Sequence, residues 1–321
     1  MPLNPDIARV LDMIERTRQP SYASQTPQAV RAAYARSAPI LDLAPAPAPM
    51  ASVEDLSVPT RDGATIRARL YLPIEPSLAE PLPALVYFHG GGFTIGSVDT
   101  HDALCRMFAR DAQCAVLSVD YRLAPEATFP TAHDDADDAF AWLHRHAGEF
   151  GLDAARLAVG GDSAGGTLAA AVAVLARDRG LQPRLQLLIY PGLTAFQQTA
   201  SHARLAHGYL LTAETIQWFF SQYVPNRADR EDWRFAPLDG MRGAPSFAGL
   251  APAWIAVAEY DPLCDEGEAY ADKLRAAGNA VALVRYDGMI HEFFKMGGFV
   301  PAVRQAHADA AQALRAAFEA D

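Results

Sequence analysis

The stretch LAVGGDSAG, residues 157–165, joins a short apolar run to a helical run that continues to Ala176. A Gly-x-Ser-x-Gly motif between a predicted strand and a predicted helix is typical of a nucleophile elbow. Its glycines leave room for neighbouring backbone, and the start of a helix favours developing negative charge. The stretch therefore predicts that Ser163 is a nucleophile, with a glycine-rich turn capped by serine as the structural alternative.

Short apolar runs rich in Val, Ile and Leu recur on both sides of this stretch. Most do not alternate with polar residues, which favours strands that are buried on both faces of a parallel sheet. Asp62-Gly63 predicts a hairpin turn between the first two runs. The sequence thus predicts an α/β fold, with a mostly parallel eight-stranded sheet flanked by helices. The predicted strands are residues 53–58, 66–71, 84–88, 115–119, 157–159, 185–189, 253–258 and 281–284.

Two segments fall outside this pattern and predict a helical cap. Residues 1–45 have apolar spacing typical of two helices, and the Pro-Ala repeat at 45–49 reads as a stiff linker. After residue 190 the alternation lapses, although 213–224 predict a helix with Thr212 as its N-cap. We therefore divide the chain into an N-terminal cap segment (1–45), a first core part (46–190), a second cap segment (191–250) and a second core part (251–321).

A second glycine motif, His89-Gly90-Gly91-Gly92, directly follows the predicted strand 84–88. Glycines after a strand leave backbone N–H groups free to hold the oxyanion of a tetrahedral intermediate. A phosphate-binding loop is the alternative, but the chain lacks the Gly-x-x-x-x-Gly-Lys-Ser/Thr pattern at this place. Together the two glycine motifs indicate acyl transfer.

A nucleophilic serine needs a base and an acid, and in folds of this kind the acid precedes the histidine in the chain. Asp261 follows the predicted strand 253–258 and His291 follows the last strand, so both fall at carboxyl ends of strands. Asp265 and Glu259 are the rival acids, and Asp265 is the more plausible support residue. The other histidines are expected on helices, in the cap or in the oxyanion loop: His89, His101, His133, His144, His146, His202, His207 and His307.

These motifs make the chain resemble the hormone-sensitive-lipase family of bacterial esterases over essentially its full length. They occur in family order: His89-Gly90-Gly91-Gly92, Tyr121-Arg122-Leu123-Ala124-Pro125-Glu126, Gly161-Asp162-Ser163-Ala164-Gly165-Gly166, Asp261-Pro262-Leu263 and His291.

The resemblance implies a catalytic triad of Ser163, Asp261 and His291. It also implies that the N–H groups of Gly91, Gly92 and Ala164 form the oxyanion hole, and that no cofactor is needed. It further implies a carboxylesterase with an α/β-hydrolase fold, acting on short- to medium-chain esters. A hydrolase of lactones, carbamates or amides is one alternative. A non-catalytic small-molecule receptor is another, although such receptors usually lose a triad residue.

Support residues are expected around this site. Asp162 and His89 are predicted to support the nucleophile and the oxyanion loop, and for His89 hydrogen bonding and simple packing both stay open. Arg122 and Glu126 are expected to order loops behind the site. An aromatic cluster at 218–223 either packs the cap on the core or lines a substrate pocket.

The composition of the chain bears on its partners and on its location in the cell. The 321 residues carry a net charge of −11, which argues against a nucleic-acid partner. The acidic residues of segment 1–18 and the absence of a long apolar run predict neither a secretory signal nor a membrane span. With three cysteines, an odd number, we expect a cytoplasmic protein.

Two further expectations concern metals and assembly. The aspartates at 134, 135, 137 and 138 suggest the acidic first turn of a helix rather than a metal site. The last strand, 281–284, is expected at a sheet edge, where edge-to-edge pairing would form a homodimer.

Overall fold

The computed structural model describes residues 1–41, 48–76 and 79–320. The predicted boundary between residues 45 and 46, and most of the predicted linker, lie outside the described residues.

The core is one mixed sheet in the order β1-β2-β4-β3-β5-β6-β7-β8. Strands β1, β2 and β4 pair antiparallel, and every pair from β4–β3 to β7–β8 is parallel, which confirms the predicted sheet. The strands are β1 (Ser52–Pro59), β2 (Thr65–Leu72), β3 (Leu82–Phe88), β4 (Ala115–Asp120), β5 (Leu152–Asp162), β6 (Gln186–Ile189), β7 (Ala253–Tyr260) and β8 (Val281–Ile290).

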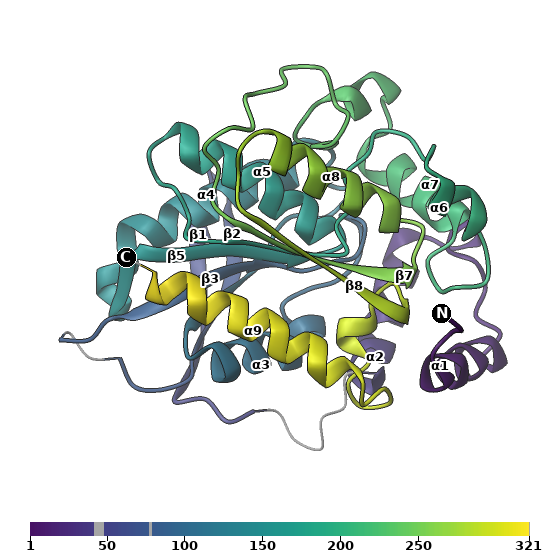
Figure 1. The fold of residues 1–321 in the computed structure, drawn as a ribbon, viewed down its shortest axis with the longest axis horizontal. Helices are drawn as coiled ribbons and strands as arrows, with labels where there is room; N and C mark the ends of the chain where they lie inside the picture. Colours follow the sequence, from purple (N-terminus) through teal and green to yellow (C-terminus); the bar gives the residue numbers. More distant parts are fainter. Residues whose placement is uncertain (42–47, 77–78, 321) are drawn as a thin grey trace.

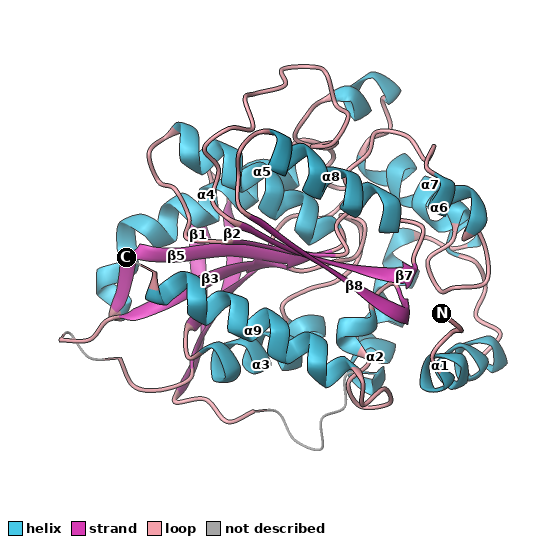
Figure 2. Cartoon of the chain, viewed as in Figure 1, coloured by secondary structure: helices cyan, strands magenta, loops and turns pink. Residues whose placement is uncertain are grey.

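Helices cover both faces of the sheet, as Figures 1 and 2 show. Helices α4, α5 and α8 lie on one face, while α3 and α9 lie on the other. The helices are α1 (Pro5–Arg16), α2 (Pro27–Leu41), α3 (Asp102–Ala112), α4 (Thr131–His146), α5 (Ala164–Asp178), α6 (Ala200–Arg204), α7 (Ala213–Tyr223), α8 (Cys264–Ala276) and α9 (Val303–Glu319).

Strand β3 explains why the strand runs are apolar without alternation. Every residue from Leu82 to Phe88 is buried. Successive side chains point to opposite faces, so Val86 packs into the core cluster on one face and Leu85 into the cluster on the other. A strand covered by helices on both sides has no face for polar residues.

The predicted cap elements lie together beyond the ends of β7 and β8 (Figure 1). A short 3₁₀ helix, η1 (Tyr22–Ser24), joins α1 to α2, and its Tyr22 ring lies edge-on to the Trp218 ring of α7 at 5.4 Å. Thr212 caps α7, accepting a hydrogen bond from the Thr215 N–H at 3.1 Å, as predicted. Two segments far apart in the sequence thus meet beyond the ends of these strands.

The aspartate cluster of α4 is paired mainly with arginines from elsewhere in the chain. Asp137 and Asp138 both bind Arg61, at 2.5 and 2.8 Å, and Asp135 binds Arg122 at 2.6 Å. The predicted helix is confirmed, but ion pairs with distant arginines hold these carboxylates in addition to any helix dipole.

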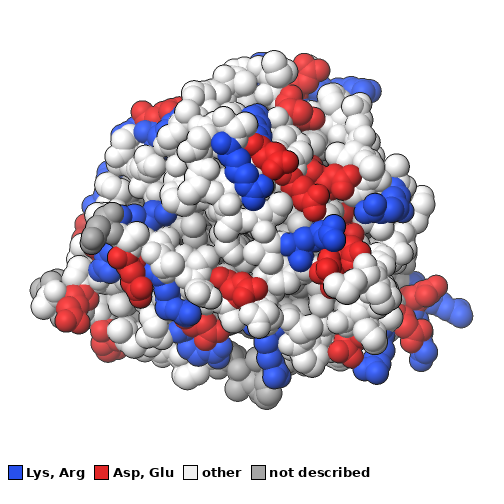
Figure 3. Space-filling view, in the orientation of Figure 1, with Lys and Arg blue, Asp and Glu red and all other residues white. Residues whose placement is uncertain are grey.

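On the face seen in Figure 3, acidic and basic side chains lie interspersed in small groups. Across the described ranges 1–41, 48–76 and 79–320, no helix is long and apolar enough to cross a membrane.

Candidate active site

Ser163 stands at the turn between β5 and α5. It has φ 55° and ψ −121°, a conformation that is costly for a residue with a side chain and that clusters at functional sites. Crowding explains the neighbouring glycines, because a Cβ atom at Gly161 or Gly165 would overlap backbone of this turn or of β3. The sequence motif therefore forms the predicted strained elbow.

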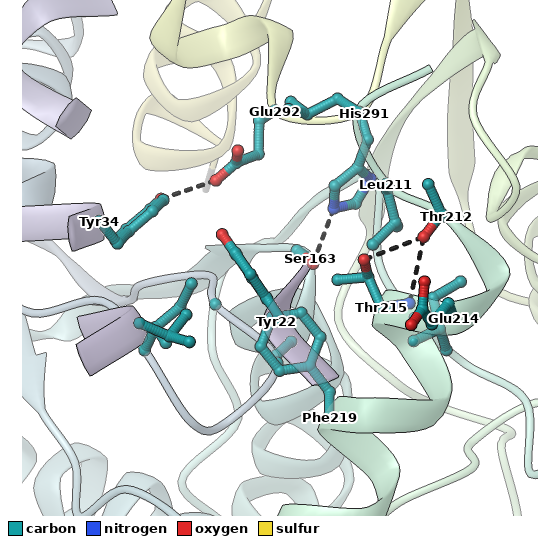
Figure 4. A pocket seen from close by; sticks show the side chains of 18 of the residues that line it. Tyr22, Tyr34, Ser163, Leu211, Thr212, Glu214, Thr215, Phe219, His291 and Glu292 are labelled. Atoms are coloured by element: carbon teal, nitrogen blue, oxygen red, sulfur yellow. Dashed lines mark hydrogen bonds between the residues drawn. The ribbon is translucent and has the colours of Figure 1, made fainter. Parts of the chain in front are cut away.

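His291 and Asp261 complete a chain of hydrogen bonds from Ser163. His291 Nε2 lies 2.9 Å from Ser163 Oγ (Figure 4), and His291 Nδ1 lies 2.6 Å from Asp261 Oδ2. Asp261 Oδ1 also accepts a hydrogen bond from the Leu263 N–H at 2.9 Å, which fixes the carboxylate. Asp261 directly follows β7 and His291 directly follows β8, as expected from the sequence.

Opposing influences set the pKa of His291. Burial lowers this pKa, but the adjacent Asp261 carboxylate favours the imidazolium, and the net effect is a pKa above the ordinary histidine value. The arrangement matches a base that gains a proton during reaction and is stabilised when it does.

The loop after β3 brings Gly91 and Gly92 to the same cavity as Ser163 and Ala164. Both glycines have positive φ, 122° and 56°, which side-chain-bearing residues rarely adopt. The Gly91 carbonyl accepts hydrogen bonds from the Thr94 and Ile95 N–H groups at 3.0 and 2.9 Å, which closes the turn.

Asp162 ties the elbow to this loop. Its Oδ1 accepts hydrogen bonds from the Tyr87 hydroxyl at 2.7 Å and from the Gly90 N–H at 3.0 Å. Burial raises the pKa of Asp162, but His101, the Tyr87 hydrogen bond and Lys295 outweigh it and hold the pKa below its usual range. A buried carboxylate thus stays ionised directly before Ser163 in the chain.

His89 forms a hydrogen bond and also packs against a ring, the two roles that the sequence left open. Its Nδ1 lies 2.8 Å from the Gly90 carbonyl oxygen, so this nitrogen carries the proton, and its ring stacks on Tyr121 at 4.3 Å. Burial, followed by His101, lowers the pKa of His89 to about 3, so the ring is neutral. Hydrogen bonding and packing together hold His89 at the start of the loop that follows β3.

Glu259 and Asp265, the other two candidates for the acid, bind groups other than His291. The Glu259 carboxylate binds the N-terminal ammonium of Met1 at 2.6 Å, and Asp265 Oδ2 accepts the Ser201 N–H at 2.7 Å. Asp265 therefore supports α6, and Asp261 is the carboxylate that reaches His291.

A cavity of about 560 Å³ lies in front of Ser163, with walls from the core and both cap segments. The aromatic residues of α7 lie in two different environments. Phe219 and Phe220 line the cavity, whereas Trp218 and Tyr223 are buried in the packing between cap and core.

A polar group beside His291 was not predicted from the sequence. The Tyr34 hydroxyl of α2 donates to Glu292 Oε1 at 2.6 Å, and the Lys295 ammonium donates to the Tyr34 oxygen at 2.8 Å. The position of Glu292 directly after His291 was the available signal, but nothing in the sequence pairs it with Tyr34.

Arg31 of α2 reaches the loop on the other side of the site. It donates to the Thr94 carbonyl at 2.7 Å and pairs with Glu126 at 2.5 Å. Glu126 thus orders the site by tethering the cap, while Arg122 pairs with Asp62 and Asp135 on the core.

Known proteins similar to this chain are ester hydrolases of one fold family. A family described as the α/β-hydrolase fold matches residues 85–295. An ethyl acetate hydrolase of Pseudomonas putida is 46% identical over 307 residues, covering 94% of each chain. The carboxylic ester hydrolase LipN of Mycobacterium tuberculosis is 49% identical over 269 residues, covering 81% of this chain and 69% of that protein.

The chain is also similar to solved structures of esterases. A hyperthermophilic esterase from the archaeon Pyrobaculum calidifontis is 39% identical with a TM-score of 0.89, covering 98% of this chain and 99% of its own. A thermostable esterase from Pseudomonas putida is 33% identical with a TM-score of 0.92, covering 100% and 99%. The resemblance drawn from the motifs is confirmed at the level of fold and enzyme class. The chain therefore belongs to the α/β-hydrolase family and is a carboxylesterase.

Proposed function

We propose that the enzyme hydrolyses carboxylic esters in two acyl-transfer steps, with Ser163 as nucleophile, His291 as general base and Asp261 as its orienting acid. The hydrogen-bonded chain Ser163–His291–Asp261, with distances of 2.9 and 2.6 Å, is the observation that carries this proposal.

In the first step His291 accepts the Ser163 proton while Oγ attacks the ester carbonyl. His291 then returns the proton to the leaving alcohol, and an acyl-enzyme remains. Water, deprotonated by the same histidine, attacks the acyl group and releases the carboxylic acid. No cofactor takes part in these steps.

The proposed oxyanion hole consists of the N–H groups of Gly91, Gly92 and Ala164. The closed turn at Gly91 and the position of Ala164 at the start of α5 support this role. Fixed donors stabilise the developing charge without reorganisation, and the loss of one typically costs about 3 kcal/mol. Asp162 and His89 are proposed to hold this loop in place.

The substrates are proposed to be esters with short to medium acyl chains. A cavity of about 560 Å³ with many apolar residues suits small ligands, and one relative is named an ethyl acetate hydrolase. Lactones, carbamates and amides share the same chemistry, so rates on paired ester and amide analogues distinguish these substrate classes.

Replacing the nucleophile tests the mechanism. Ser163→Ala should abolish hydrolysis of an activated short-chain ester and labelling by a fluorophosphonate, with an unchanged circular dichroism spectrum. Ser37→Ala, the same replacement at another serine of the cavity wall, should keep both. Undiminished turnover in Ser163→Ala would exclude the proposed role, and absence of labelling in the wild type would favour a receptor.

Three broader proposals follow from the same observations. Residues 1–45 and 191–250 are proposed to act as one cap, supported by the contact of Tyr22 with Trp218. The protein is proposed to work in the cytoplasm, supported by its low cysteine content, three residues in 321, and cell fractionation tests this. It is also proposed to form a homodimer through β8, which lies at one edge of the sheet.

A further inference from the structure

Glu292 places a carboxylate at the wall of the catalytic cavity, one residue after His291. Its backbone is left-handed, with φ 63° and ψ 9°, which is unfavourable for glutamate and is kept here by the surrounding contacts. The side chain is half-buried, and its Oε1 accepts a hydrogen bond from the Tyr34 hydroxyl. A carboxylate has room for several hydrogen bonds, so Glu292 keeps acceptor capacity toward the cavity.

Two aromatic rings line the same cavity as this carboxylate. Tyr22 and Phe219 both line it, and their ring centroids lie 5.9 Å apart. In Figure 4 the Tyr22 hydroxyl points toward the space between Ser163 and Glu292. Burial, and then the Glu292 charge, raise the pKa of Tyr22, which agrees with this proximity.

The charges around the cavity favour a cation. Lys295 is the single lysine or arginine among the described residues that line it. Only 3% of Lys295 is exposed, and its ammonium lies 4.6 Å from the centre of the Tyr34 ring. The Tyr34 oxygen accepts a hydrogen bond from this ammonium, whereas three carboxylates line the same cavity, those of Glu214, Glu266 and Glu292.

We propose that Glu292, together with the rings of Tyr22 and Phe219, forms an ammonium subsite that selects esters of amino alcohols. Carboxylates and aromatic faces are the groups that bind alkylammonium ions, through charge-assisted hydrogen bonds and cation–π contacts. The inference rests on the proposed roles of Ser163 and His291. His291 must deliver its proton to the leaving alkoxide, so the alcohol part of the ester lies beside the Glu292 wall.

A pair of isosteric esters tests this subsite. The dimethylaminoethyl ester of butyric acid carries an ammonium at neutral pH, and the isoamyl ester has the same shape without the charge. The wild type should have the higher kcat/KM on the charged ester. Glu292→Gln should lower the ratio of the two kcat/KM values about fivefold, since the charge-assisted contact is lost.

Glu214→Gln is the matched control, because it removes an exposed carboxylate from another part of the same cavity wall. It should leave the ratio close to that of the wild type. An unchanged ratio in Glu292→Gln would overturn the proposal and leave Glu292 as a counter-charge for Lys295 alone.

A measurement on the wild type covers the case in which Glu292→Gln does not fold. Tetramethylammonium chloride should inhibit isoamyl butyrate hydrolysis competitively, and sodium chloride at equal ionic strength should not. Equal effects of the two salts would overturn the subsite. A wild type that does not hydrolyse the isoamyl ester at all would instead contradict the proposed function.

Discussion

At the scale of single residues, the pKa of His291 makes the mechanism testable by pH. Only neutral imidazole can accept the Ser163 proton, so activity falls as pH drops through the His291 pKa. Because Asp261 raises this pKa against the effect of burial, the acid limb of kcat/KM should lie above pH 6.5, the ordinary histidine value. Asp261→Asn should move the limb to lower pH and reduce kcat about 10⁴-fold.

Asp265→Asn serves as the control for this pH experiment. Asp265 is also an aspartate at the beginning of α8, but it binds the Ser201 N–H instead of His291. In this variant the acid limb of the kcat/KM profile should lie at the same pH as in the wild type. A limb that moves equally in both variants would indicate a general electrostatic effect and contradict the specific pairing with Asp261.

The crowding at the elbow gives a second prediction, for stability. Gly165→Ala should lower the free energy of unfolding by about 3 kcal/mol, because the new Cβ would overlap the Phe88 carbonyl and the backbone must shift. Gly148→Ala, where a Cβ meets nothing within 4 Å, should change it by less than about 0.5 kcal/mol. Urea unfolding measures both, and similar losses in the two variants would refute the packing argument.

The positions of the proposed site residues could be predicted from sequence, because each lies directly or shortly after the end of a strand. Ser163 and Gly91 follow strands and lie in glycine-rich turns, which only a few functions require. Glu292 could not be assigned, since its partner Tyr34 is 258 residues away and contributes an ordinary helical tyrosine. Pairings of this kind arise from tertiary packing and leave no local pattern.

At the scale of elements, helix α2 holds the oxyanion loop from outside. Arg31 binds the Thr94 carbonyl at 2.7 Å, contacts the Ala124 carbonyl and pairs with Glu126. Arg31→Leu should therefore lower the free energy of unfolding by about 2 kcal/mol, the cost of leaving such charge-assisted hydrogen bonds unmade. It should also reduce kcat/KM by loosening the loop.

Arg36→Leu, on the exposed side of the same helix, provides the comparison for Arg31→Leu. It should leave stability within about 0.5 kcal/mol and activity unchanged. If both variants behave alike in urea unfolding and ester hydrolysis, the tether from α2 to the loop has no special role.

Strand centres were predicted well, and strand ends were not. Strand β5 begins at Leu152, five residues before the predicted start, because the polar stretch with Asp153 and Arg156 does not look like a buried strand. Strand β8 continues to Ile290, past Gly288, whose φ of 72° and hydrogen bond to Glu259 accommodate the irregular pairing with β7. Such extensions depend on neighbouring strands that the local sequence does not describe.

At the scale of the whole molecule, strand order assembles the site. In the sequence of neighbours β3-β5-β6-β7-β8, the oxyanion loop follows β3, Ser163 follows β5, Asp261 follows β7 and His291 follows β8. The carboxyl ends of these strands all lie at the same end of the parallel sheet. Open α/β sheets bind ligands there. Apolar runs predict that strands exist, but their order depends on crossovers, which only the folded chain specifies.

The two sheet edges differ in a way that predicts the assembly. Strand β1 exposes the acidic Glu54 and Asp55, which discourage pairing of like edges, whereas β8 presents the mainly apolar run 281–284. Light scattering should therefore give twice the 34.6 kDa chain mass at micromolar concentration. Ala282→Lys, an exposed position on β8, should give the monomer mass, while Val53→Lys on β1 should stay dimeric. A wild type that is monomeric at every concentration, or a dimer that survives Ala282→Lys, would exclude pairing through β8.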